Sequence, residues 1–76
     1  MLSADDSISI WVRAMQAEIA EIHMRNLGAR MHDILGELST ASAMVGLAEH
    51  RGKVSDADKE RVDAKLRRAR AMLPRR

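Results

Sequence analysis

His32 and Asp33, two neighbouring residues near the middle of the chain, are the residues of this sequence best suited to chemistry. A surface imidazole can attack a phosphoryl group when a carboxylate holds one ring nitrogen by a hydrogen bond and leaves the other nitrogen free. The apolar pattern around His32 predicts a helix and places this residue beside the apolar stripe, on the edge that faces solvent. His32 is therefore a candidate nucleophile, and the alternative is an ordinary exposed histidine.

Metal and thiol chemistry have little support in the sequence. It contains no cysteine, which excludes disulfides, thiolate zinc sites and thiol catalysis. His23 and His50 lie too far from His32 along a helix to share a metal ion with it. We expect no metal site, no cofactor and no enzymatic activity of this chain alone.

The segment Ala29 to Thr40, ARMHDILGELST, resembles the first helix of the dimerisation and phosphotransfer hairpin of two-component sensor histidine kinases. In one branch of that family the phosphorylated histidine is followed by Asp, two further residues, Gly, and a Leu-Ser or Leu-Thr pair. The resemblance covers about residues 25–73 and implies that His32 accepts the phosphoryl group, with Asp33 as its acid–base neighbour. Because the sequence has no glycine-rich nucleotide loop, the resemblance implies a hairpin without an ATP-binding domain, or a mimic that engages a kinase or response regulator.

The element that carries these residues is predicted to be a long coiled-coil-like helix. Apolar residues recur in alternating steps of three and four, which is typical of a coiled-coil seam. The seam contains Ala17, Ala20, Met24, Leu27, Met31, Ile34, Leu38, Ala41, Val45 and Ala48. We expect its large members to be buried where the chain folds back on itself or meets a second copy; this dimer seam comprises Met24, Leu27, Met31, Ile34, Leu38 and Val45.

Capping and turn residues divide the chain into helices of a single all-α domain, residues 1–76. The expected helices cover about 4–25, 27–50 and 56–73, and the first two are either continuous or interrupted near Asn26 and Gly28. Gly52 and Ser55 predict a turn at 51–54, because glycine ends helices and serine begins them. The predicted fold is a helical hairpin with one long helix that dimerises into a four-helix-type bundle.

The N-terminal segment is rich in large apolar side chains. One stripe runs along it in steps of four and three and contains Ile8, Val12, Met15, Ile19 and Ile22. Trp11 adds a side chain of the type that dominates protein interfaces. We interpret Ile8, Trp11, Val12 and Met15 as a surface that binds a partner protein, with packing across the homodimer as the alternative for Trp11. The favoured function is a small non-enzymatic helical regulator or adaptor.

Charge is distributed unevenly along the chain. Residues 1–50 hold seven acids and three bases, a balance of −4, whereas residues 51–76 hold ten bases and four acids, a balance of +6. The predicted basic patch consists of Arg67, Arg68, Arg70, Arg75 and Arg76. It suggests weak, sequence-independent nucleic-acid binding or contact with an acidic protein, and the alternative is that these cations only offset the helix dipole.

Membrane association is not predicted. No stretch approaches the ~20 apolar residues that span a bilayer, and the N-terminus has no basic region followed by an apolar run. We expect a soluble, cytoplasmic protein with no membrane partner.

Overall fold

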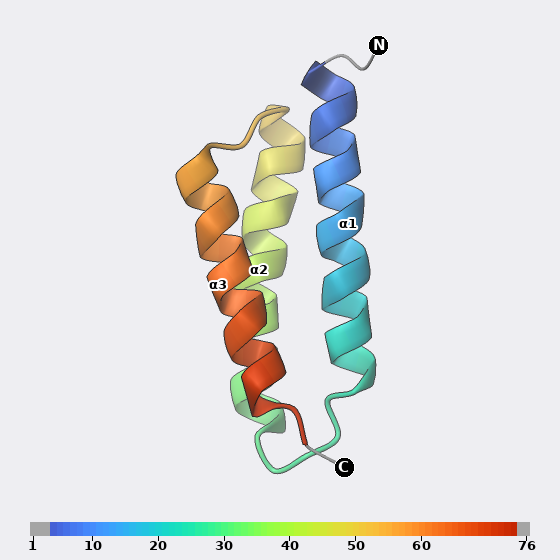
Figure 1. Ribbon diagram of the computed structural model, residues 1–76, viewed down its shortest axis with the longest axis vertical. Coiled ribbons are helices and arrows are strands. Elements are labelled where there is room, and N and C mark those ends of the chain that lie inside the picture. The colour runs from blue at the N-terminus through green and yellow to red at the C-terminus, as the bar shows by residue number, and fades with distance from the viewer. Residues whose placement is uncertain (1–3, 75–76) are drawn as a thin grey trace.

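The computed structural model describes residues 4–74, and within this range the protein is all-α, as predicted, with no strand. Helix α1 covers Ala4–Met24, α2 covers Met31–Arg51 and α3 covers Asp56–Met72. The three helices lie side by side with successive helices antiparallel, in an elongated body of 43 × 20 × 16 Å (Figure 1). None of these three helices has the length and apolar character needed to cross a membrane.

Helix α2 is the centre of the packing. Both α1 and α3 pack along it, whereas α1 and α3 contact each other far less. An ion pair between Arg70 of α3 and Glu18 of α1 joins these two outer helices. Pro74, just after α3, lies against the α1–α2 loop: a Cβ atom added to Gly28 would lie only 3.3 Å from the Cδ and Cγ atoms of Pro74.

The α2–α3 turn forms where glycine and serine predict it. Gly52 has a φ of 71°, and its N–H donates to the carbonyl oxygens of Ala48, at 2.9 Å, and Glu49, at 3.3 Å. This left-handed conformation, which glycine adopts without strain, closes α2. Ser55 then accepts a hydrogen bond from the N–H of Asp58 at 3.1 Å and caps α3. The turn therefore follows from local chemistry alone.

The connection between α1 and α2 is a true break. Of the two alternatives, a continuous helix or a break near Asn26 and Gly28, the structure has the break: residues 25–30 separate two helices of 21 residues each. Asn26 is 5% exposed, and its side-chain amide donates to the carbonyl oxygen of Met31 at 3.2 Å. This hydrogen bond ties the loop to the first residue of α2. The chain therefore reverses direction between the two halves of the predicted seam.

Because the chain reverses direction, some seam residues are buried and others are exposed. The half in α2 is buried inside one copy of the chain and consists of Ile34, Leu38, Ala41, Val45 and Ala48. The larger seam residues before Ile34 are exposed: Met24 is 73% exposed, Leu27 80%, and Met31, the first residue of α2, 40%. The predicted dimer seam is corrected accordingly. Ile34, Leu38 and Val45 belong to the core of a single chain, where a second copy cannot reach them.

Helices α1 and α3 complete this core, and the residues that α1 contributes belong to its predicted stripe. From α1 come Val12 and Ile22, which are 2% exposed, with Ile8, Met15 and Ile19 packed beside them. From α3 come the fully buried Val62, Leu66 and Ala69, whereas Ala57, at the start of the helix, is exposed.

Replacing Leu38 with Ala should lower the free energy of unfolding by about 2–5 kcal/mol, because a fully buried side chain leaves a cavity. Replacing Leu27 with Ala should change it by no more than about 0.5 kcal/mol, since Leu27 is exposed. Urea denaturation followed by circular dichroism measures both values. Equal losses for the two variants would contradict the assignment of Leu27 to the surface.

Candidate binding surfaces

The N-terminal cluster predicted to bind a partner lies mostly against the protein's own core. Val12 is buried, and Ile8, Trp11 and Met15 are half-buried and pack against the core cluster. Trp11 also lines a pocket of about 160 Å³, together with Met44 from α2. These four side chains therefore attach α1 to the bundle, and the half-buried Ile8, Trp11 and Met15 leave only part of their surface open to a partner.

His32 occupies the first turn of α2 and is exposed, as is Asp33. The hydrogen bonds within residues 4–74 include none between these two side chains, since neighbours in a helix point in different directions. His32 and Asp33 both line an open groove of about 600 Å³, together with Glu37 and with Arg68 of α3. Arg68 lies 3.9 Å from Glu37, between Nη1 and Oε2. A guanidinium in this groove would attract an anionic group toward the imidazole.

The other two histidines do not join this group. His23 and His50 are exposed near the ends of α1 and α2. Within the described part of the chain, no group of three or more His, Asp or Glu side chains is arranged to hold a metal ion.

The arginines of the predicted basic patch do not form one surface. Arg67 donates to Asp63 at 3.2 Å on the outer side of α3, and this hydrogen bond, with the charge of the carboxylate, raises the pKa of its guanidinium. Arg68 turns toward Glu37 of α2, and Arg70 turns toward Glu18 of α1. Arg75 and Arg76 lie outside the described residues. The patch is therefore divided among three sides of α3.

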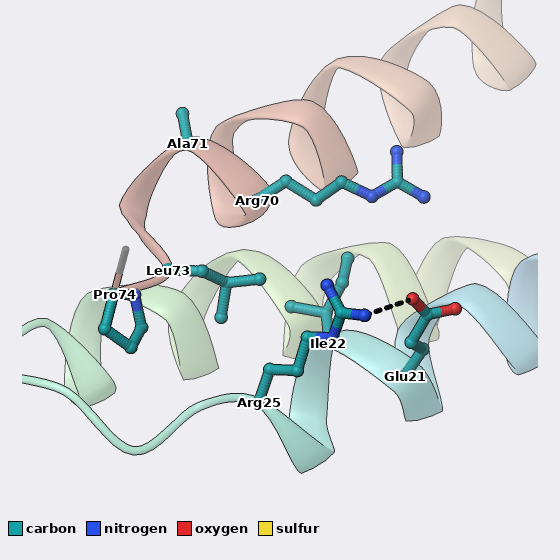
Figure 2. Close-up of a pocket in the computed structure, with 7 residues that line it drawn as sticks. All are labelled: Glu21, Ile22, Arg25, Arg70, Ala71, Leu73 and Pro74. Atoms are coloured by element: carbon teal, nitrogen blue, oxygen red, sulfur yellow. Dashed lines mark ion pairs between the residues drawn. The ribbon is translucent and has the colours of Figure 1, made fainter. Parts of the chain in front are cut away.

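Arg25, outside the predicted basic patch, and Arg70 line the same pocket at one end of the bundle. Arg25, which follows α1, and Arg70 of α3 line opposite walls of a pocket of about 280 Å³, with Ile22 and Leu73 between them (Figure 2). Arg25 also forms an exposed ion pair with Glu21, with Nη2 and Oε1 3.5 Å apart. Glu21 also lines the pocket, so a ligand with a carboxylate and an apolar group would bind here by replacing Glu21 as the partner of Arg25.

Exposed apolar side chains lie close to this pocket in the chain. Met24, Leu27 and Met31 belong to the end of α1, the loop and the start of α2, and Arg25 and Arg30 lie among them in the sequence. The seam periodicity predicts that these three side chains are buried, and it indicates no role for the two arginines. Asn26 and Gly28 are the residues in the sequence that could indicate this exposure, because a helix break there moves the neighbouring seam positions to the surface.

Comparisons with protein families, with curated proteins and with solved structures found no match to this chain. The resemblance to the phosphotransfer hairpin therefore stays a prediction.

Replacing Trp11 with Ala should lower the free energy of unfolding by about 2–4 kcal/mol, somewhat less than for a fully buried aromatic residue. Ser9→Ala, at an exposed position of the same helix, is the control and should leave it within about 0.5 kcal/mol. Thermal and urea unfolding measure the two variants. A Trp11→Ala protein as stable as the control would show that Trp11 serves a partner and not the core.

Proposed function

We propose that this protein is a non-enzymatic helical adaptor that works as a homodimer and binds an acidic segment of a partner protein at its arginine end. The arginine end is defined as residues 24–31 and 68–74, which Figure 1 shows together at one end of the bundle. The proposal rests on one observation: exposed apolar side chains and an excess of positive charge coincide there.

The cluster of exposed apolar side chains is the more unusual of these two features. Five large apolar side chains of the described residues are strongly exposed, and three of them, Met24, Leu27 and Met31, belong to the arginine end. A cluster of exposed apolar groups is typical of interaction sites, whereas single ones are common on any surface. Methionine side chains are flexible and suit contacts with a partner of variable shape. Burial of these groups would provide the binding energy.

The charges define the kind of partner. The two segments of the arginine end contain four arginines and no acidic residue. Three of these arginines have carboxylate neighbours on adjoining turns or helices: Arg25 has Glu21, Arg68 has Glu37 and Arg70 has Glu18. Exposed ion pairs contribute only about 0–1 kcal/mol, and the Arg25–Glu21 pair is exposed on both sides, so an acidic partner can replace Glu21 at little cost.

A protein partner fits this surface better than a nucleic acid does. Single-stranded nucleic acids bind basic surfaces on which aromatic side chains stack with the bases. The one aromatic residue, Trp11, lies in the half of α1 away from the arginine end and packs against the core. Exposed Met and Leu side chains offer no stacking surface, but they match the apolar anchors of protein interfaces.

The arginine end can be tested with Arg25→Gln, Arg70→Gln and Leu27→Ser in affinity capture from the native host, with mass spectrometry and then calorimetry on the purified partner. Each arginine substitution should weaken binding roughly tenfold or more, because a charge-assisted hydrogen bond contributes about 1.5–3 kcal/mol.

Two matched controls separate binding from folding. Glu18→Gln breaks the same ion pair as Arg70→Gln but keeps the arginine, so partner binding should persist. Arg67→Gln removes an arginine that lies outside the arginine end and should have no effect. Loss of binding in either control, or recovery of nucleic acid in place of protein, would contradict the proposed surface.

Phosphotransfer through His32 is the second candidate, favoured by the groove that this exposed imidazole shares with Arg68. On the adaptor proposal, incubation with a phosphorylated response regulator or a histidine kinase should leave no acid-labile phosphoryl group on the protein, because Asp33 does not orient the imidazole. Mass spectrometry at neutral pH tests this expectation. A phosphoryl group that is lost in His32→Gln and kept in His50→Gln would place phosphotransfer ahead of the adaptor role.

A further inference from the structure

The pocket between Arg25 and Arg70 has an apolar lining that the fold holds in place. This lining includes Ile22, which is buried in the core, and Leu73 and Pro74, which follow α3 (Figure 2). The N–H of Leu73 donates to the carbonyl oxygen of Arg70 at 3.1 Å, and Pro74 packs against the α1–α2 loop. The apolar surface is therefore formed before any ligand arrives, which lowers the entropy cost of binding.

A side chain of the protein itself marks the position of an anion in this pocket. Glu21 lines the pocket, and its Oε1 atom lies 3.5 Å from Nη2 of Arg25 (Figure 2). The side chains of Glu21 and Arg25 are 59% and 68% exposed, so Glu21 can turn into solvent and stay hydrated. Arg70 differs, because the side chain of its partner Glu18 is only 24% exposed. Arg25 is therefore the arginine whose carboxylate partner can be exchanged.

We propose that this pocket binds the C-terminal residue of the partner protein, with the terminal carboxylate on Arg25 and an apolar side chain against Ile22 and Leu73. In this arrangement the carboxylate of the ligand takes the place of Glu21. The inference rests on the acidic partner of the proposed function and specifies which part of that partner enters the pocket.

A C-terminal residue matches this pocket better than other acidic groups do. Its carboxylate and its side chain are attached to the same carbon atom, so one residue supplies the anion and the apolar group together. An aspartate or glutamate side chain supplies only the anion, and an internal acidic segment needs two residues to supply both. The pocket volume of about 280 Å³ lies just below the usual range for small-molecule sites, which suits a single residue better than a nucleotide. Capture of a C-terminal carboxylate is an established mode of peptide recognition.

The charges around the pocket also match a ligand with one negative charge. Once Glu21 turns into solvent, the lining keeps the two positive charges of Arg25 and Arg70. Glu18 offsets one of them, so one positive charge is left for the ligand. A guanidinium has five N–H donors, and Arg70 therefore retains donors for a ligand oxygen while it is paired with Glu18. The two oxygens of a terminal carboxylate can accept from both walls of the pocket.

The inference can be tested with an N-acetylated acidic peptide that ends in leucine, prepared as the free acid and as the C-terminal amide. Calorimetry should show that the amide binds at least tenfold more weakly, because it lacks the charge that Arg25 binds. Glycine in place of the terminal leucine should also weaken binding roughly tenfold, since the apolar contact is lost. In NMR spectra the free acid should shift the methyl signals of Ile22 and Leu73.

Three matched variants identify the residues that act. Arg25→Gln should remove the difference in affinity between the free acid and the amide. Glu21→Gln should tighten binding of the free acid about two- to fivefold, because the competing carboxylate is removed. Glu60→Gln removes the same charge at an exposed position of α3 and should leave the affinity unchanged. All three side chains are exposed, so circular dichroism should show unchanged helical content.

The outcomes separate failure of the inference from failure of the proposed function. Equal affinity for the free acid and the amide, with binding lost in Arg25→Gln, would overturn the inference and leave an acidic partner at the arginine end. Affinity for N-acetylleucine as high as for the peptide would show that the pocket takes a small carboxylic acid, and would overturn a protein C-terminus as its occupant. Binding of neither peptide at millimolar concentration would overturn both proposals.

Discussion

The burial of α2 between α1 and α3 is the interaction on which the rest of the structure depends. Ile34, Leu38 and Val45 of α2 are at most 3% exposed, and they contact stripes from both outer helices. The core contains no phenylalanine or tyrosine, and much of it is alanine and valine. Small side chains like these bury little apolar area each, so the stability of the core requires close helix packing over the whole length of α2. The rotation of α1 and α3 about α2 then decides which of their side chains reach the surface.

This constraint explains why one heptad pattern leads to two different outcomes. The seam before residue 25 and the seam after residue 30 have the same spacing, but the loop between them turns the chain around. α1 carries apolar residues on two sides, and the side with Val12 and Ile22 packs against α2. The side with Ala17 and Met24 is then left facing outward. Periodicity shows that a helix face is apolar; it does not show what covers that face.

Local chemistry could be predicted and geometry between helices could not. Gly52 and Ser55 determine the α2–α3 turn through their own backbone and side-chain hydrogen bonds, so the sequence predicts it closely. The pocket lined by Arg25 and Arg70 depends on how α1 and α3 are positioned relative to each other. The spacing of residues within a single helix carries no information about that arrangement. The same reason explains the basic patch. Its arginines are close together in the sequence, but Arg68 pairs with Glu37 of α2 and Arg70 pairs with Glu18 of α1, so their side chains point in different directions.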